Sequence, residues 1–177
     1  MQITTPCQIL IMSDHKHMNL LSLFSGCGGM DIGFEGDFVC LKKSINTNLH
    51  PEWIKKDLGD WVLVTPTIFN TVFANDIRPS AKAAWVSYFS KKKGNANDIY
   101  HLESIVNLAK RAKMGEAIFP ADIDIVTGGF PCQDFSIAGK RLGFNSQKSH
   151  IGQVLANDEP SVESRGQLYM WMREIVT

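Results

Sequence analysis

The stretch Leu20-Leu21-Ser22-Leu23-Phe24-Ser25-Gly26-Cys27-Gly28-Gly29 decides the fold. Its first half is an apolar run of the kind that forms a buried β-strand, and its second half is a glycine-rich turn. A ligand approaches the backbone closely only where no Cβ intervenes, so the glycines predict a seat for a nucleotide-like cofactor. A tight strand-to-helix turn without a ligand explains the same stretch. The dinucleotide fingerprint needs glycine at position 31, and Asp31 therefore disfavours a nicotinamide cofactor.

Strand-like and helix-like segments alternate along the rest of the chain. Four strands are predicted, the third being the weakest, at residues 19–24, 71–74, 96–100 and 123–127. Helices are predicted at 80–89 and 101–113, where apolar residues recur at helical spacing. This alternation predicts an α/β fold with a mostly parallel sheet covered by helices on both faces. Ligands of such sheets bind beyond the carboxyl ends of the strands.

Two carboxylates follow predicted strands and strengthen the cofactor interpretation. Asp76 ends the second strand, where it can accept hydrogen bonds from two ribose hydroxyls. Asp98 follows the third strand and can accept a hydrogen bond from an adenine amine. The alternative for Asp76 is a cap for the helix that begins near Ser80.

A second glycine turn carries a cysteine. In Asp122-Ile123-Asp124-Ile125-Val126-Thr127-Gly128-Gly129-Phe130-Pro131-Cys132-Gln133, a fourth apolar strand ends in two glycines, and Cys132 follows on a loop restricted by Pro131. Exposed backbone amides at this edge, together with Lys140 and Arg141, can stabilise a thiolate, which is the attacking form of cysteine. An inert, packed thiol is the alternative, and the position after the strand favours the nucleophile.

The composition indicates a globular chain and excludes several classes. The 177 residues contain 18 Lys+Arg, 18 Asp+Glu, 44% apolar residues and no apolar run of membrane-spanning length. A chain this long buries a core without disulfides or metals, so no metal is predicted. Because the charges balance, any nucleic-acid interpretation must rest on local residues. The four cysteines form no Cys-x-x-Cys pair and residues 8–12 are too short for a secretory core, so we expect a cytoplasmic chain with reduced thiols.

Three stretches lie outside the regular alternation. Residues 37–70 lack a clean period and predict an insertion with partial packing of its own. Residues 144–164 are rich in Ser, Asn, Gln, Gly and Asp, which favours a mobile loop that begins at about residue 132. Residues 166–177 predict a helix that has barely begun. We therefore expect one partial domain over residues 1–177, incomplete at the carboxyl terminus.

Three motifs together resemble the DNA cytosine-5 methyltransferases of bacterial restriction-modification systems. They are Phe24-Ser25-Gly26-Cys27-Gly28-Gly29, Phe130-Pro131-Cys132-Gln133-Asp134-Phe135-Ser136 and Ser164-Arg165-Gly166-Gln167-Leu168. The resemblance spans residues 19–177 apart from the insertion. It implies the Rossmann-like fold of methyltransferases that use S-adenosylmethionine. It also implies that this chain corresponds to the amino-terminal half of the catalytic domain.

The resemblance implies a role for each matching residue. The residues that would bind S-adenosylmethionine, or its product S-adenosylhomocysteine, are Phe24, Ser25, Gly26, Cys27, Gly28, Gly29, Asp76, Ile77, Asp98, Ile99, Phe130 and Leu168. Asp76 would bind the ribose and Asp98 the adenine edge, while Ile77 stands where many relatives have a bulky aromatic residue. The candidate contacts to double-stranded DNA of a specific target sequence are Gln133, Ser136, Lys140, Arg141 and Arg165.

Cys132 would be the nucleophile of the implied reaction. Its thiolate would add to carbon 6 of a cytosine, which makes carbon 5 nucleophilic enough to accept a methyl group. The cytosine must first leave the base stack, and the loop after Cys132 would close over the flipped base.

Some elements of the family do not occur in these 177 residues: a Glu-Asn-Val segment, a Gln-x-Arg-x-Arg segment and a target-recognition region. Without the glutamate that engages the cytosine ring nitrogen, we expect the chain to be inactive alone. Three alternatives stay open. They are a methyltransferase for cytosine in transfer RNA, a non-catalytic or complementing subunit of a split enzyme and, least favoured, an NAD-binding oxidoreductase. No membrane partner is expected.

Overall fold

A four-stranded parallel sheet forms the centre of the computed structural model, which describes residues 17–131, 153 and 165–176. The strand order is β6-β5-β1-β7 and all three pairings are parallel. The strands are β1 (Met18–Leu23), β5 (Phe69–Asp76), β6 (Tyr100–Leu102) and β7 (Ile125–Gly128). The predicted mostly parallel sheet is therefore confirmed.

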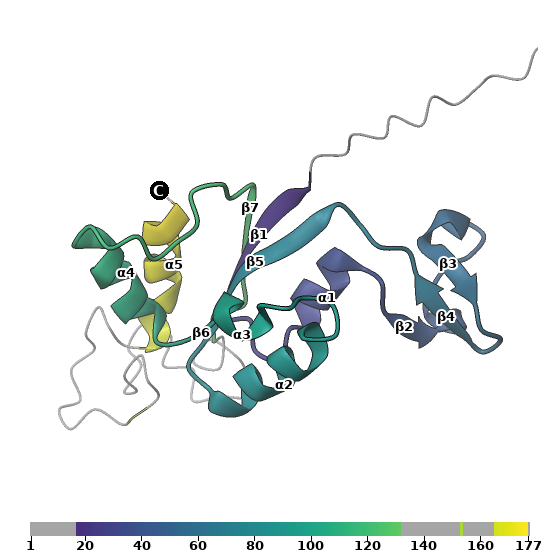
Figure 1. Cartoon of the computed structure of the whole chain (residues 1–177), viewed down its shortest axis with the longest axis horizontal. Helices are drawn as coiled ribbons and strands as arrows, with labels where there is room; N and C mark the ends of the chain where they lie inside the picture. Colours follow the sequence, from purple (N-terminus) through teal and green to yellow (C-terminus); the bar gives the residue numbers. More distant parts are fainter. Residues whose placement is uncertain (1–16, 132–152, 154–164, 177) are drawn as a thin grey trace, which may run out of the picture.

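Helices cover both faces of this sheet (Figure 1). One face carries α1 (Gly29–Glu35), α2 (Pro79–Phe89) and α3 (Ala96–Ile99). The other carries α4 (Ile105–Lys113) and α5 (Leu168–Val176), which the short 3-10 turn η3 (Arg165–Gln167) precedes. Among the described residues, no helix is long and apolar enough to cross a membrane.

Neighbouring side chains of β5 belong to two different hydrophobic clusters, because successive residues of a strand point to opposite faces. Leu21, Leu23 and Phe73 pack with residues of α4 and with Leu168 on one face. Ala74, the neighbour of Phe73, packs with Trp85 and other residues of α2 and α3 on the opposite face. The two clusters fix the helices against the two faces of the sheet. The loops that connect strands to helices are therefore held at the ends of the strands.

Two predicted boundaries are wrong around the third strand. Residues 96–99 form helix α3 instead of a strand, and β6 begins at Tyr100. The predicted helix over 101–113 begins only at Ile105, because the preceding residues pair with β5. Ser104 caps α4, since its side chain accepts a hydrogen bond from the Val106 N–H at 3.3 Å. Leu102 fits the helical period but is 43% exposed at the end of the strand. The period alone therefore placed the helix start one turn too early.

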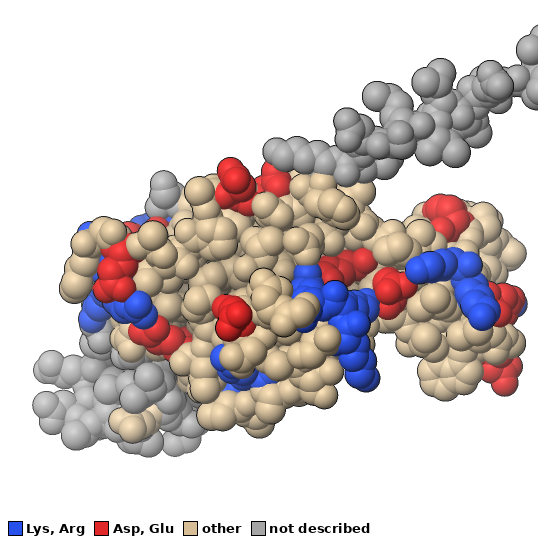
Figure 2. Space-filling view, in the orientation of Figure 1, with Lys and Arg blue, Asp and Glu red and all other residues tan. Residues whose placement is uncertain are grey.

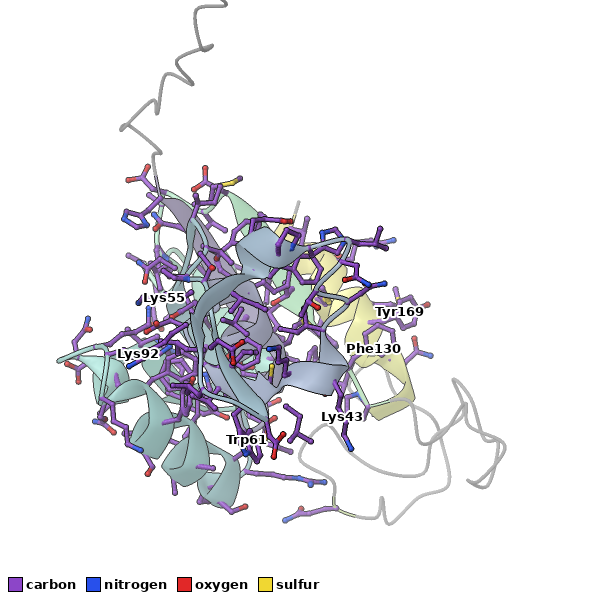
Figure 3. The ribbon with its side chains drawn as sticks, turned by 90° about the vertical axis from the view of Figure 1, so that its right-hand side faces the viewer. Lys43, Lys55, Trp61, Lys92, Phe130 and Tyr169 are labelled. Atoms are coloured by element: carbon purple, nitrogen blue, oxygen red, sulfur yellow. The ribbon has the colours of Figure 1, made fainter. Side chains whose placement is uncertain are left out.

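A second, smaller sheet lies at one end of the molecule (Figure 1). It has the antiparallel order β2-β4-β3 and falls within the stretch 37–70, for which the sequence shows no clean period. Its elements are β2 (Val39–Leu41), η1 (Lys42–Ser44), η2 (Pro51–Trp53), β3 (Ile54–Asp57) and β4 (Trp61–Val64). Val62 is fully buried, whereas Trp53 and Trp61 are each 48% exposed. The small sheet thus has little core of its own, and Trp61 lies at its surface with Lys43 (Figure 3).

A narrow neck joins the small sheet to the parallel sheet. The chain leaves after α1 and returns near Thr67, whose N–H donates to the Glu35 carbonyl at 3.0 Å. Gly36 has a φ of 67°, and a Cβ at this position would clash with the Thr65 carbonyl, so the neck requires glycine.

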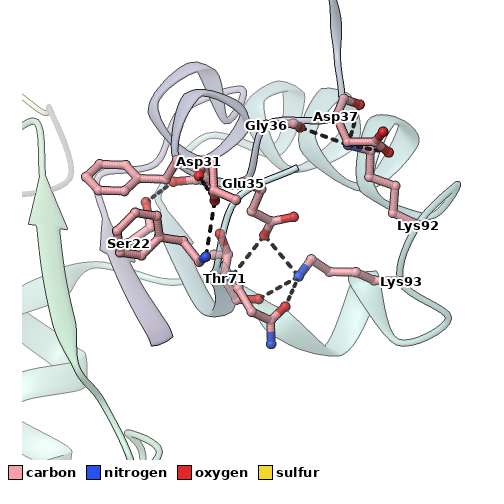
Figure 4. Close-up of polar contacts among 12 residues, drawn as sticks. Ser22, Asp31, Glu35, Gly36, Asp37, Thr71, Lys92 and Lys93 are labelled. Carbon is pink, nitrogen blue, oxygen red and sulfur yellow. Dashed lines mark hydrogen bonds and ion pairs between the residues drawn. The ribbon is translucent and has the colours of Figure 1, made fainter. Parts of the chain in front are cut away.

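Two lysines that follow α2 brace this neck (Figure 4). The Lys92 ammonium donates to the carbonyls of Gly36 and Asp37, at 3.2 and 2.8 Å. The Lys93 ammonium pairs with Glu35 at 2.9 Å. Figure 2 shows basic and acidic side chains next to one another at the junction of the two sheets, which agrees with the ion pairs. The lysines therefore act here as structural ties.

Candidate functional site

A cavity of about 470 Å³ opens at the carboxyl ends of the parallel strands. This is the edge of the sheet at which α/β folds bind their ligands. The lining residues come from the carboxyl end of β5, from the loops that follow β1, β5, β6 and β7, and from α2, α4 and α5: Phe24, Gly26, Cys27, Asn75, Asp76, Ile77, Arg78, Ser80, Ala81, Ser104, Ile105, Gly129, Pro131 and Leu168. The glycine turn, the carboxylate after β5 and the turn that leads to Cys132 therefore share one space.

Hydrogen bonds hold the turn after β1 in place. The Ser25 N–H donates to the Asn75 carbonyl at 2.8 Å, and the Gly28 N–H donates to the Ser25 carbonyl at 3.0 Å. The Tyr100 hydroxyl donates to the Gly26 carbonyl at 2.9 Å. Burial raises the pKa of the Tyr100 phenol above its usual value, so this group remains a protonated donor at neutral pH. The turn is thus fixed by both neighbouring strands, β5 and β6.

The buried side of the turn packs against α2. Gly28 has a φ of 89°, and a Cβ there would lie 2.6 Å from Cδ1 of Trp85, which is fully buried. The Trp85 Nε1–H donates to Asp31 at 2.6 Å, and the Ser22 hydroxyl donates to the same carboxyl group at 2.5 Å. Asp31 is fully buried, so both of its oxygens need these donors. Dashed lines in Figure 4 mark the hydrogen bonds that this carboxyl group accepts.

Burial raises the pKa of Asp31 above its ordinary value, because the charged form loses its hydration. The hydrogen bonds from Ser22 and Trp85 oppose that effect and the nearby charge of Glu35 adds to it. Asp31, whose sequence position disfavours a nicotinamide cofactor, is therefore a structural link between β1, α1 and α2.

Asp76 faces the open side of the turn. Its carboxylate accepts a hydrogen bond from the Gly26 N–H at 3.1 Å and another from the Arg78 N–H at 3.0 Å. The alternative role as a helix cap is not observed, because Arg78 occupies the N-cap of α2 and no side chain caps that helix. Two amides therefore orient a half-buried carboxylate at the cavity, and its remaining lone pairs can accept hydrogen bonds from ligand hydroxyls.

Half of the predicted cofactor residues line the cavity: Phe24, Gly26, Cys27, Asp76, Ile77 and Leu168. Ser25, Gly28 and Gly29 belong to the same turn but do not line it. Asp98 is exposed on α3 and Ile99 packs in the cluster around Trp85, so the structure does not bring this pair to the cavity.

Phe130 also lies outside the cavity lining, between two residues that belong to it. It is 39% exposed and its ring centroid lies 6.3 Å from that of Tyr169 on α5 (Figure 3). The backbone on either side, at Gly129 and Pro131, forms the wall instead.

Several lining residues were missed by the sequence reasoning. Ser104 and Ile105 follow β6, so they occupy the place after the third strand that was assigned to Asp98. The available signal was a capping serine before an amphipathic run. Asn75 was also missed: its side chain donates to the carbonyls of His101 and Glu103, at 3.1 and 2.6 Å. Asn75 thereby ties the loop after β6 to the end of β5.

The predicted nucleophile Cys132 and the predicted DNA contacts Gln133, Ser136, Lys140 and Arg141 lie outside the described residues. The side chain of Arg165 does as well, although its backbone begins η3. Pro131, the last described residue before Cys132, lines the cavity. The described cysteines, Cys27 and Cys40, are free thiols.

The lining fits a ligand that contains adenosine. Asp76 presents acceptor oxygens suited to two adjacent hydroxyls, as on a ribose. The side chains of Phe24, Ile77, Ile105 and Leu168 provide apolar surface for a flat ring. The cavity volume lies in the ordinary range for sites that bind small molecules.

Comparisons with known proteins agree with the motifs. The model of the C-5 cytosine-specific DNA methylase family matches residues 18–157. The Type II methyltransferase M.BspRI of Lysinibacillus sphaericus is 35% identical over 125 residues, which is 70% of this chain and 26% of that protein. M.BsuRI of Bacillus subtilis is 34% identical over 71% of this chain and 25% of that protein. The chain spans about a quarter of the length of these relatives. No solved structure matches it.

Proposed function

Because the chain belongs to the family of C-5 cytosine-specific DNA methylases, we propose that it forms the cofactor-binding and nucleophile-bearing part of a DNA cytosine-5 methyltransferase. One observation carries the proposal: the glycine turn, Asp76 and Pro131 line the same cavity, and Pro131 is bonded to Cys132. A cofactor in this cavity and a base near Cys132 would meet at one edge of the sheet. In this proposal the chain is a partial catalytic domain with an insertion at about 37–70 and a loop over 132–164.

S-adenosylmethionine is the proposed cofactor, and when bound it supplies an electrophilic methyl group. We assign its ribose to Asp76 and its adenine to the apolar walls formed by Ile77 and Ile105. The backbone of Gly26 and Cys27, beside Phe24, would hold the methionine part. Ser104 and Ile105 take the role after the third strand in place of Asp98 and Ile99, because only the first pair lines the cavity.

Cys132 is the proposed nucleophile. Its thiolate would form a bond to carbon 6 of cytosine, and the displaced electron pair would make carbon 5 nucleophilic toward the methyl group. A proton would then leave carbon 5 and the thiolate would leave carbon 6, which restores the aromatic ring. The step needs a proton or strong hydrogen bond at the ring nitrogen, and these 177 residues hold no Glu-Asn-Val segment to provide it. We therefore expect no methylation by this chain alone.

The proposed partner is double-stranded DNA from which the target cytosine is flipped, since a thiolate cannot reach carbon 6 inside the stack. Gln133, Ser136, Lys140, Arg141 and Arg165 stay the proposed DNA contacts. A polypeptide with the missing segments would complete the site. We place the protein in the cytoplasm, as expected for free cysteines.

The cofactor assignment is tested by titrating the chain with S-adenosylhomocysteine in a calorimeter. Asp76→Asn should weaken binding about tenfold, because an amide accepts fewer hydrogen bonds than a carboxylate. Asp98→Asn, at an exposed position outside the cavity, is the matched control and should bind like the unaltered chain. Equal affinities for the Asp76 variant and the unaltered chain would contradict the ribose assignment.

The catalytic assignment is tested with labelled S-adenosylmethionine and duplex DNA of mixed sequence. The chain alone should incorporate no methyl groups, and a polypeptide with the missing segments should restore incorporation. Cys132→Ala should abolish the restored activity, whereas Cys40→Ala, in the small sheet, should leave it unchanged. Methylation by the chain alone would overturn the predicted inactivity, and an active Cys132→Ala pair would overturn the nucleophile.

A further inference from the structure

The cavity at the carboxyl ends of the strands contains one cationic side chain within the described part of the chain, that of Arg78. It also contains one carboxylate, that of Asp76, two residues away. The Arg78 guanidinium forms no ion pair with Asp76 or with any other described residue, although its backbone N–H is bonded to that carboxylate. A cation that lines a cavity and is not neutralised by its nearest anion is available to a ligand.

Helix α2 offers no partner to the guanidinium of Arg78. Arg78 is the N-cap residue of α2, an 11-residue helix whose first residue is Pro79. The amino terminus of a helix carries partial positive charge, so it offers no attraction to a guanidinium. The neighbouring cavity residues on α2, Ser80 and Ala81, are small. The long arginine side chain can therefore cover a ligand without displacing other groups.

The charge of the proposed cofactor limits what this arginine can do. S-adenosylmethionine carries two positive groups, a sulfonium and an ammonium, and one negative carboxylate. The positive guanidinium of Arg78 would therefore be repelled by the sulfonium if the two lay side by side. Adenine is neutral and flat, and a planar guanidinium stacks on such rings in a way that an ammonium does not. Ile77, the adjacent cavity residue, is 39% exposed and offers an aliphatic contact but no aromatic ring. The adenine end is thus the place where Arg78 contributes most.

We propose that Arg78 is a cofactor-binding residue whose guanidinium stacks on the adenine ring of the cofactor while Asp76 binds the ribose. This inference rests on the proposed function, and it assigns the cover of the adenine to a residue on α2. The apolar side chains of Ile77 and Ile105 supply the remaining contacts to the ring.

The test measures the affinity of the full chain for two ligands by calorimetry. S-adenosylhomocysteine contains the amino acid group, whereas 5′-methylthioadenosine has adenosine but no carboxylate. Arg78→Ala removes the charge and the plane, and Arg78→Lys retains only the charge. We expect both variants to bind both ligands about 3- to 30-fold more weakly than the unaltered chain. Lys91→Ala, an exposed cation beyond the other end of α2, is the control and should change neither affinity.

Each other outcome overturns the inference in a distinguishable way. A loss confined to S-adenosylhomocysteine would mean that Arg78 binds the carboxylate. Full retention of affinity by Arg78→Lys would mean that charge alone matters. If the unaltered chain binds both ligands and Arg78→Ala binds them equally well, only the role of Arg78 is lost. If the unaltered chain binds neither, the proposed function is lost as well. Thermal unfolding of each variant verifies that the fold is intact, and exposed Arg78 should leave the midpoint unchanged.

Discussion

The two sides of the glycine turn after β1 differ in what occupies the space beside them. At Gly28, a Cβ would meet the indole of Trp85, and the buried carboxyl group of Asp31 lies behind that indole. At Gly26, two residues earlier, nothing lies within 4 Å of a Cβ, and the surface beyond belongs to the cavity. Both glycines have positive φ. The same residue type thus serves packing on one side and ligand approach on the other.

The largest effect is expected at the packed glycine. Gly28→Ala places a methyl group into the indole of Trp85 at a φ of 89°, so we expect a loss of about 3 kcal/mol in the free energy of unfolding. Urea denaturation followed by tryptophan fluorescence measures this change. Gly29→Ala, the next residue, has open space around its Cβ and should lose far less. Similar losses for the two variants would remove the distinction between the sides.

The indole N–H is the next test of the buried side. Trp85→Phe removes the donor to Asp31 and leaves a small cavity in place of the pyrrole ring, so we expect a loss of about 2 kcal/mol in the free energy of unfolding. Trp61→Phe, on the half-exposed surface of the small sheet, is the matched control and should change stability little. Comparison of the two denaturation midpoints decides the matter, and a stable Trp85→Phe protein would contradict the importance of this bond.

The buried side should also respond to pH in a particular direction. The folded pKa of Asp31 is raised above its ordinary value of 3.8, so the folded state holds this proton more tightly than the unfolded state. The contribution of Asp31 to stability is therefore complete below pH 3.8 and declines as pH rises through the raised pKa. Asp31→Asn cannot titrate, so its stability relative to the unaltered chain should increase over that interval. Urea titrations of both proteins across the interval give the difference, and a difference that decreases with pH would contradict the burial argument.

The smallest stability effect is expected on the open side. Gly26→Ala keeps a φ of 55° that costs an alanine about 1 kcal/mol, but its methyl group meets no protein atom. The methyl group would project at the cavity, so the affinity for S-adenosylhomocysteine should decrease more clearly than the stability. Calorimetry and urea denaturation on the same preparation compare the two losses. A variant that unfolds as readily as Gly28→Ala would show that both sides are packing surfaces.

Much of the parallel sheet could be predicted from the sequence because its strands are short apolar runs that end in turns. The first strand is β1, in the interior of the sheet, and the glycine turn follows it at the carboxyl ends of the strands, where the sequence predicts it. Asp76 was found because a carboxylate that follows a second strand has a specific position in such folds. In each case one local pattern determined one local structure.

The region around β6 could not be predicted because local signals there compete. Ala96, Ile99 and Tyr100 fit a strand as well as a helical turn, and tertiary packing against Trp85 decides between them. Leu102 matched the helical period although it lies at the end of a strand. The third-strand site residues shifted with this boundary, from Asp98 to Ser104. The order of the small sheet was equally hidden, since its strands have three or four residues and little burial.

The neck at Gly36 affects how this protein can vary. The chain departs from the parallel sheet and rejoins it at points that are hydrogen-bonded to each other, between Thr67 and Glu35. The segment between these two points can therefore be lengthened, shortened or replaced as a whole, because no strand of the parallel sheet has to move. Variation between related sequences can therefore accumulate in the small sheet while the geometry at the carboxyl ends of β1 and β5 is preserved.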